Sequence, residues 1–127
     1  MPDNHLFEYA VVRLVPRVER EEFLNVGVIV YCPSQQFLRA KYALDERRLR
    51  AFSATVEVED VRANLRALEL ISAGDQHSGP IAHLDRAARF RWLTAVRSTV
   101  IQTSPVHPGL CADAPDALEA LFDRVVL

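Results

Sequence analysis

The stretch NVGVIVYCPSQQFLRAKYAL, residues 25–44, decides the fold. Its first eight residues are β-branched or apolar at nearly every position, which is typical of a strand that is buried on both faces. Residues 33–36 read as a turn, and in the strand that follows Arg39 and Lys41 share one face while apolar side chains share the other. Because the turn leaves no room for a crossover helix, the two strands are expected to pair as an antiparallel hairpin.

Asn25 and Gly27 lie at the start of this stretch. Gly27 interrupts an apolar run, which predicts a β-bulge or a close approach of another backbone. Asn25 is expected to close the turn before the strand, with its amide bonded to nearby backbone. The alternative is that Asn25 and Glu22 line a cleft at the end of the sheet.

Working outward, LFEYAVVRLV (residues 6–15) predicts a strand in the middle of the sheet, ended by Pro16, and STVIQT (residues 98–103) predicts a fourth strand. Four segments have helical periodicity or a helix-capping aspartate; they are residues 46–52 after Asp45, residues 57–72, the stretch that begins at Asp85, and the C-terminal segment that begins at Asp113. The order predicts an α+β fold, with a mostly antiparallel sheet of about four strands and helices packed on one face. We expect residues 1–127 to form a single α+β domain.

Composition excludes some classes of protein. The chain of 127 residues has a formal net charge of −2, so it has no overall basic field of the kind that nucleic-acid binding favours. No apolar run approaches the roughly 20 residues that a membrane-spanning helix needs, and the first residues do not resemble a secretory signal. We therefore expect a cytoplasmic protein, without membrane insertion, whose Cys32 and Cys111 are reduced thiols.

The segment RFRWLTAVRSTVIQTSPVHPGLC, residues 89–111, is rich in reactive side chains. Three hydroxyl residues and His107 could belong to a catalytic triad, but no GxSxG motif exposes a serine. His107 and Cys111 are four residues apart, and no second ligand pair of the kind found in zinc sites accompanies them. No catalytic residue, metal ligand or cofactor is therefore assigned from this segment.

Arginine is the more informative residue type, because 14 of the 15 basic residues are arginine. If Arg97 lies at a helix–strand junction beside Ser98, their donors could hold an anion or an acidic segment of a partner. The candidate binding residues are Arg97 and Ser98, supported by Arg89 and Arg91, with Asn25 at the end of the sheet. The alternative is a solvated polar face on which arginines pair with nearby glutamates. A second basic cluster is offset by Asp45 and Glu46; its members are Arg39, Lys41, Arg47, Arg48 and Arg50.

Three segments also carry a family resemblance: YAVVRLVP at residues 9–16, EEFLNVGV at residues 21–28 and RFRWLTAVRST at residues 89–99. Their order and spacing resemble a bacterial family known as domain of unknown function three-zero-three-seven, over nearly the whole chain. The resemblance implies a small bacterial protein without an established activity, so no catalytic residue is carried over. It also implies that some members are encoded beside a serine/threonine kinase-like protein of the toxin-kinase type.

These observations favour a small non-enzymatic protein-interaction or regulatory domain, with the kinase-like protein as the candidate partner. The first alternative is a nucleic-acid or phosphate-binding module that uses the arginine clusters, and the second is a hydrolase-type enzyme. An exposed strand edge would also allow a homodimer.

Overall fold

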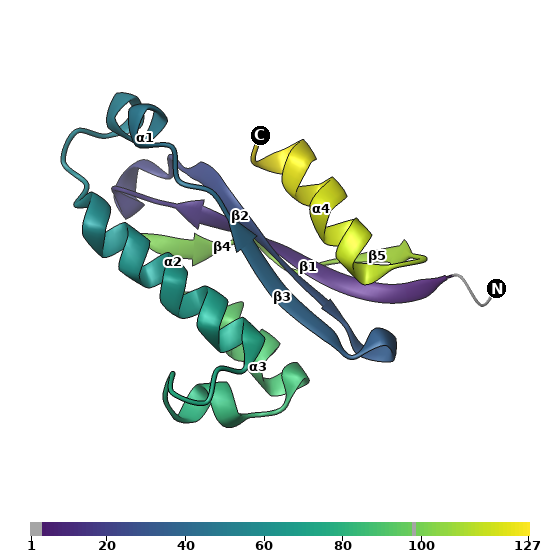
Figure 1. Ribbon diagram of the computed structural model, residues 1–127. Helices are drawn as coiled ribbons and strands as arrows, with labels where there is room; N and C mark the ends of the chain where they lie inside the picture. The colour runs from purple at the N-terminus through teal and green to yellow at the C-terminus, as the bar shows by residue number, and fades with distance from the viewer. Residues whose placement is uncertain (1–3, 98) are drawn as a thin grey trace.

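The computed structural model describes residues 4–97 and 99–127, and in these residues five strands form one antiparallel sheet (Figure 1). The strands are β1 (His5–Leu14), β2 (Leu24–Cys32), β3 (Phe37–Tyr42), β4 (Ile101–Thr103) and β5 (His107–Cys111). Strand β1 pairs with β2 on one side and with both β4 and β5 on the other, and β3 forms the outer edge beside β2. The predicted hairpin is confirmed, with the 3₁₀ turn η2 (Pro33–Gln35) between β2 and β3.

Four α-helices occur in the described residues: α1 (Glu46–Phe52), α2 (Val58–Ala73), α3 (Arg86–Leu93) and α4 (Ala114–Val125). Two 3₁₀ turns, η1 (Val18–Arg20) and η3 (Pro80–His83), lie in the connections. The three predicted capping aspartates are confirmed, because the carboxylates of Asp45, Asp85 and Asp113 accept hydrogen bonds from backbone N–H groups in the first turns of α1, α3 and α4. None of the described helices has the length and apolar composition that crossing a membrane requires.

The α+β class is confirmed, but the helices cover both faces of the sheet rather than one. Figure 1 shows β2 and β3 between α2 and α4. On one face α2 and α3 enclose a core that contains Ile29 and Leu65, and on the other α4 packs Leu118 against Val28. Strand β2 is apolar on both faces because each face lies beneath a helix.

Lys41 shows why the sequence pattern predicts helices on only one face of the sheet. The alternation of apolar and basic residues in β3 predicts that Lys41 faces solvent, whereas its ammonium pairs with Glu119 of α4. The ammonium also lies 4.5 Å from the centre of the Phe122 ring, at a distance typical of a cation–π contact. The charged face of β3 is therefore covered by an amphipathic helix that supplies one carboxylate.

The predicted irregularity at Gly27 is confirmed. The pairing of β1 with β2 changes register between Val12, opposite Gly27, and Arg13, opposite Asn25. A Cβ atom on Gly27 would lie 2.7 Å from the carbonyl oxygen of Lys41, so the backbones of β2 and β3 approach too closely for a side chain.

The fourth strand is shorter than predicted and is followed by a fifth. Strand β4 covers Ile101–Thr103 rather than residues 98–103. The next residue, Ser104, is bonded to β1 through its own N–H, which donates to the Val11 carbonyl at 2.8 Å, and through its hydroxyl, which accepts from the Val11 N–H at 2.9 Å. Because Pro105 has no N–H group, the ladder is interrupted there and resumes at His107 as β5.

Candidate binding groove

A hollow of about 270 Å³ lies between α2, α3 and the segment that leads into β4. We call it the tryptophan hollow. The apolar side chains of Leu68, Leu93 and Ile101 line it, together with Trp92 and Arg97. Leu68 and Leu93 also belong to the core beneath, so the apolar lining is an extension of the packed interior. The complete lining is Asn64, Ala67, Leu68, Ile71, Trp92, Leu93, Arg97, Thr99 and Ile101.

Trp92 and Arg97 form one unit in this lining. The Trp92 side chain is 39% exposed although it is large and apolar. The Arg97 guanidinium lies 4.2 Å from the centre of the Trp92 ring and donates a hydrogen bond to the Trp92 backbone carbonyl. These two contacts hold the guanidinium over the indole, and within the described residues no other hydrogen bond of this guanidinium is found.

The Arg89 side chain binds backbone carbonyls within the fold. Its guanidinium donates to the backbone carbonyl of Leu84 at 2.6 Å and to that of Ser72 at 3.4 Å. The second bond satisfies a carbonyl in the last turn of α2, which has no partner within the helix. Burial lowers the pKa of the Arg89 guanidinium from its ordinary value, and the nearby positive charge of Arg86 acts in the same direction. Arg89 thus joins α3 to the end of α2.

The other candidate residues are dispersed. Arg91 lies on α3 and is exposed. Asn25 bonds through Nδ2 to the carbonyl of Val125 in α4 at 3.1 Å, rather than to nearby backbone, so it faces the opposite side of the sheet from Arg97. Ser98 lies outside the described residues. Of the four predicted site residues that the structure describes, Arg97 lines the tryptophan hollow and the other three do not.

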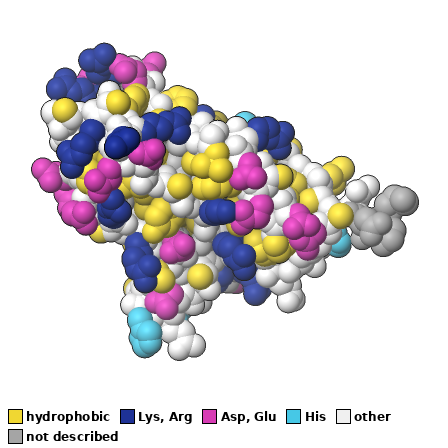
Figure 2. Space-filling view, turned by 45° about the horizontal axis from the view of Figure 1, so that its top comes forward, with side chains coloured by type: hydrophobic (Ala, Val, Ile, Leu, Met, Phe, Trp, Pro, Cys, Tyr) yellow, Lys and Arg dark blue, Asp and Glu magenta, His cyan; other side chains and the backbone are white. Residues whose placement is uncertain are grey.

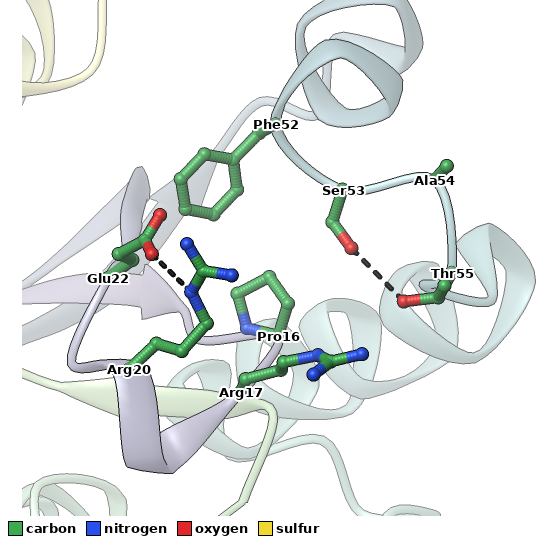
Figure 3. A pocket seen from close by; sticks show the side chains of 8 residues that line it. All are labelled: Pro16, Arg17, Arg20, Glu22, Phe52, Ser53, Ala54 and Thr55. Carbon is green, nitrogen blue, oxygen red and sulfur yellow. Dashed lines mark hydrogen bonds and ion pairs between the residues drawn. The ribbon is translucent and has the colours of Figure 1, made fainter.

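A second hollow of about 290 Å³ lies where the β1–β2 connection faces the loop between α1 and α2 (Figure 3). We call it the arginine hollow. Arg20 is held by Glu22, whose carboxylate lies 2.5 Å from Arg20 Nε, and Arg17 extends along the same side. The hydroxyls of Ser53 and Thr55 are 3.3 Å apart on the facing loop. Pro16, Phe52 and Ala54 complete the lining.

A third hollow connects these two, and we call it the middle hollow. It shares Pro16 and Thr55 with the arginine hollow and Asn64 with the tryptophan hollow. The remaining lining residues are Val56, Glu57, Asp60, Val61 and Val100. Neighbouring hollows have lining residues in common, so the three hollows adjoin one another along α2, and we call them together the α2 groove.

The family comparison agrees with the resemblance found in the sequence. The family described as "Protein of unknown function (DUF3037)" matches residues 9–126, which include every strand and helix that lines the α2 groove. The chain belongs to the DUF3037 family. None of the curated proteins and none of the solved structures compared with this DUF3037 chain matches it.

Of the hydroxyl and imidazole groups that could belong to a catalytic triad, those of Thr99, Ser104 and His107 have structural partners in the DUF3037 fold, and Ser98 lies outside the described residues. Ser104 is 2% exposed, and its hydroxyl both accepts from Val11 and donates to the Pro105 carbonyl at 2.9 Å. His107 stacks on Tyr9, with ring centres 5.4 Å apart. The Thr99 hydroxyl donates to the Ile101 carbonyl at 2.6 Å. Within residues 4–97 and 99–127, no three His, Cys, Asp or Glu side chains are grouped as metal ligands would be.

Arg17 and Arg20 are not among the site residues that the sequence predicts. They lie three residues apart after Pro16, in a segment that reads as a polar connection. The signal available was the pair itself, since a 3₁₀ turn brings residues three apart onto one side. Their counterpart on the α1–α2 loop is more than thirty residues away in the sequence, so only the fold of the DUF3037 chain shows that the two segments face each other.

Proposed function

We propose that this DUF3037 protein is a non-enzymatic interaction or regulatory domain, formed by residues 1–127, that binds a segment of another protein in the α2 groove. The supporting observation is the pairing of Trp92 with Arg97 beside an apolar floor. Tryptophan and arginine are the residue types most enriched among the side chains that dominate binding energy at protein interfaces. A half-exposed indole whose face is fixed by a guanidinium loses little conformational freedom when a partner covers it.

The nucleic-acid alternative has weaker support. Figure 2 shows acidic side chains interspersed with Lys and Arg at the end of the molecule that carries α1. A phosphate backbone needs a continuous basic track, because it carries a negative charge at every nucleotide. Arg89 also donates to backbone carbonyls inside the fold and does not extend such a track.

The kinase-like protein implied by the family resemblance is the first partner to test. Both chains would be co-expressed, purified through a tag on one of them, and analysed by size-exclusion chromatography. We expect a stoichiometric complex with the native protein and loss of that complex with Trp92→Ala. Leu110→Ala is the matched control, because Leu110 is 67% exposed and lies on β5, outside the groove.

Two results would contradict the proposal. One is that neither the kinase-like protein nor any other product of the neighbouring genes forms a stoichiometric complex. The other is a complex that survives Trp92→Ala while the variant remains folded by circular dichroism. Either result would remove the α2 groove as the binding surface.

A further inference from the structure

The length of the α2 groove restricts what can occupy it. The groove follows α2 from Glu57, in the middle hollow, to Ile71, in the tryptophan hollow. At about 1.5 Å per helical residue this distance is about 20 Å, and the arginine hollow extends it further. An extended peptide rises about 3.3 Å per residue, so roughly six to eight residues would fill the groove.

The charges along the groove alternate in sign. Arg17 and Arg20 lie at one end, where Glu22 pairs with Arg20 and leaves Arg17 as the net positive charge, and Arg97 lies at the other. Between them the middle hollow contains the exposed carboxylates of Glu57 and Asp60. The pattern along α2 is therefore positive, negative, positive.

Most of these charges have no opposite charge beside them in the described residues. No ion pair there involves Arg17, Arg97, Glu57 or Asp60. The nearest basic residue of α2, Arg62, is paired with Glu46 and Glu59 instead. The groove thus presents three separate charged positions whose complement would come from a ligand.

Between the charged positions the walls are apolar. Val56, Val61 and Val100 line the middle hollow, and Leu68 and Ile71 line the tryptophan hollow. Val100 is 39% exposed, so an apolar side chain of a ligand could cover it. A ligand with charged groups only would leave this surface in water.

We propose that the α2 groove binds an extended peptide segment with acidic side chains at both ends, a basic side chain between them and apolar side chains in the intervening positions. This inference rests on the proposed function, because it specifies the partner segment that the groove accepts. Electrostatic complementarity of this kind sets the register of the peptide more than its affinity. Contact with the apolar walls and with Trp92 supplies the affinity.

The test uses a randomised twelve-residue peptide display library selected on the immobilised full-length protein. We expect the enriched sequences to share acidic, basic and acidic positions in that order. Selection on the Arg17→Glu/Arg20→Glu variant should change one acidic end to a basic one, and selection on Arg97→Glu should change the other. Selection on Asp60→Lys should change the central basic position to an acidic one.

Binding constants of individual peptides then make the test quantitative. A peptide enriched on the native protein should bind the Arg97→Glu variant about threefold to tenfold more weakly by fluorescence anisotropy, as expected for reversing one exposed ion pair. Arg124→Glu is the matched control, because it makes the same change in net charge on α4, beyond the sheet. The Arg124→Glu variant should bind the peptide with the same affinity as the native protein.

The outcomes separate this inference from the proposed function. If Trp92→Ala abolishes the complex with the partner protein but the enriched sequences do not respond to the charge reversals, the charge pattern is wrong and the interaction role stands. If no peptide is enriched, the extended-peptide mode is overturned. If the partner complex survives Trp92→Ala, the proposed function itself fails.

Discussion

The hydroxyl of Ser72, in the last turn of α2, accepts a hydrogen bond from the backbone N–H of Ala40 in β3 at 3.2 Å. Strand β3 is at the edge of the sheet, where an N–H group that points outward has no strand to pair with. Ser72 is 1% exposed and also donates to the Glu69 carbonyl at 2.7 Å. The contact therefore fixes α2 against the edge of β3 and determines where one wall of the α2 groove lies.

Replacing Ser72 should destabilise the fold. Ser72→Ala leaves the buried Ala40 N–H without an acceptor, which should lower the free energy of unfolding by about 1–3 kcal/mol. Urea denaturation followed by circular dichroism would measure the change. Ser34→Ala is the control, because the exposed Ser34 hydroxyl bonds to the side chain of His5 and its loss should cost about 0.5 kcal/mol or less. A change below that value for Ser72→Ala would contradict the role assigned to this contact.

The contact between Phe7 and Gly109 gives a second test. A Cβ atom on Gly109 would lie 2.5 Å from Cζ of the Phe7 ring, which crosses the backbone of β5. Gly109→Ala should therefore destabilise the protein by about 1–3 kcal/mol through overpacking. In a Phe7→Leu background the same substitution should cost less, because the shorter side chain leaves room for the methyl group. Equal costs in the two backgrounds, measured by thermal unfolding, would show that the ring is not the obstacle.

The parts of the fold that depend on local sequence could be predicted. The β2–β3 hairpin follows from a short turn between apolar runs, and Asp45, Asp85 and Asp113 cap helices because their carboxylates reach N–H groups two or three residues away. Gly27 likewise marked an irregular position within a single strand.

The parts of the fold that depend on contacts between distant segments could not be predicted from the sequence. Lys41 reads as a solvent-facing residue until α4 supplies Glu119, which is 78 residues further along the chain. Proline is unfavourable inside a sheet, but Pro108 lies on an edge strand opposite Glu8, where its missing N–H costs nothing. For the site, Arg97 could be predicted because it lies between a predicted helix and a predicted strand, whereas Arg17 becomes part of a groove only when the α1–α2 loop faces it.

The thiol of Cys111 should react slowly with alkylating reagents. Burial raises the pKa of this thiol above its ordinary value of 9.0, and the neighbouring Cys32 thiol and Asp113 carboxylate act in the same direction. Since the thiolate is the reactive species, iodoacetamide at pH 8 should modify Cys111 more slowly than a cysteine in an unstructured peptide. Mass spectrometry would locate the modification, and Cys111→Ser would confirm the assignment. A rate equal to that of the peptide would contradict the raised pKa.

The same pKa shift predicts the direction of a pH effect on stability. A group whose pKa is higher in the folded state holds its proton more tightly there than in the unfolded chain. As the pH rises above 9.0, the unfolded chain loses the Cys111 proton first, so the free energy of unfolding should fall. Urea denaturation of the native protein and of Cys111→Ser at pH 8 and pH 10 would measure it, and the variant should lose less stability between the two values.

Trp92 is the one tryptophan of the chain, so its fluorescence reports directly on the α2 groove. The Arg97 guanidinium covers one face of the ring, at 4.2 Å from its centre. Arg97→Ala should expose that face to water, which should move the emission to longer wavelength and increase the quenching constant for acrylamide.

Arg91→Ala is the matched control, because Arg91 is an exposed arginine next to Trp92 in sequence for which no contact with the ring is found in the described residues. The stacking is worth about 0.5–1 kcal/mol at an exposed site, so the variant should remain folded and the optical change should reflect the ring alone. Identical quenching of the native protein and of Arg97→Ala would show that the guanidinium does not cover the indole in solution.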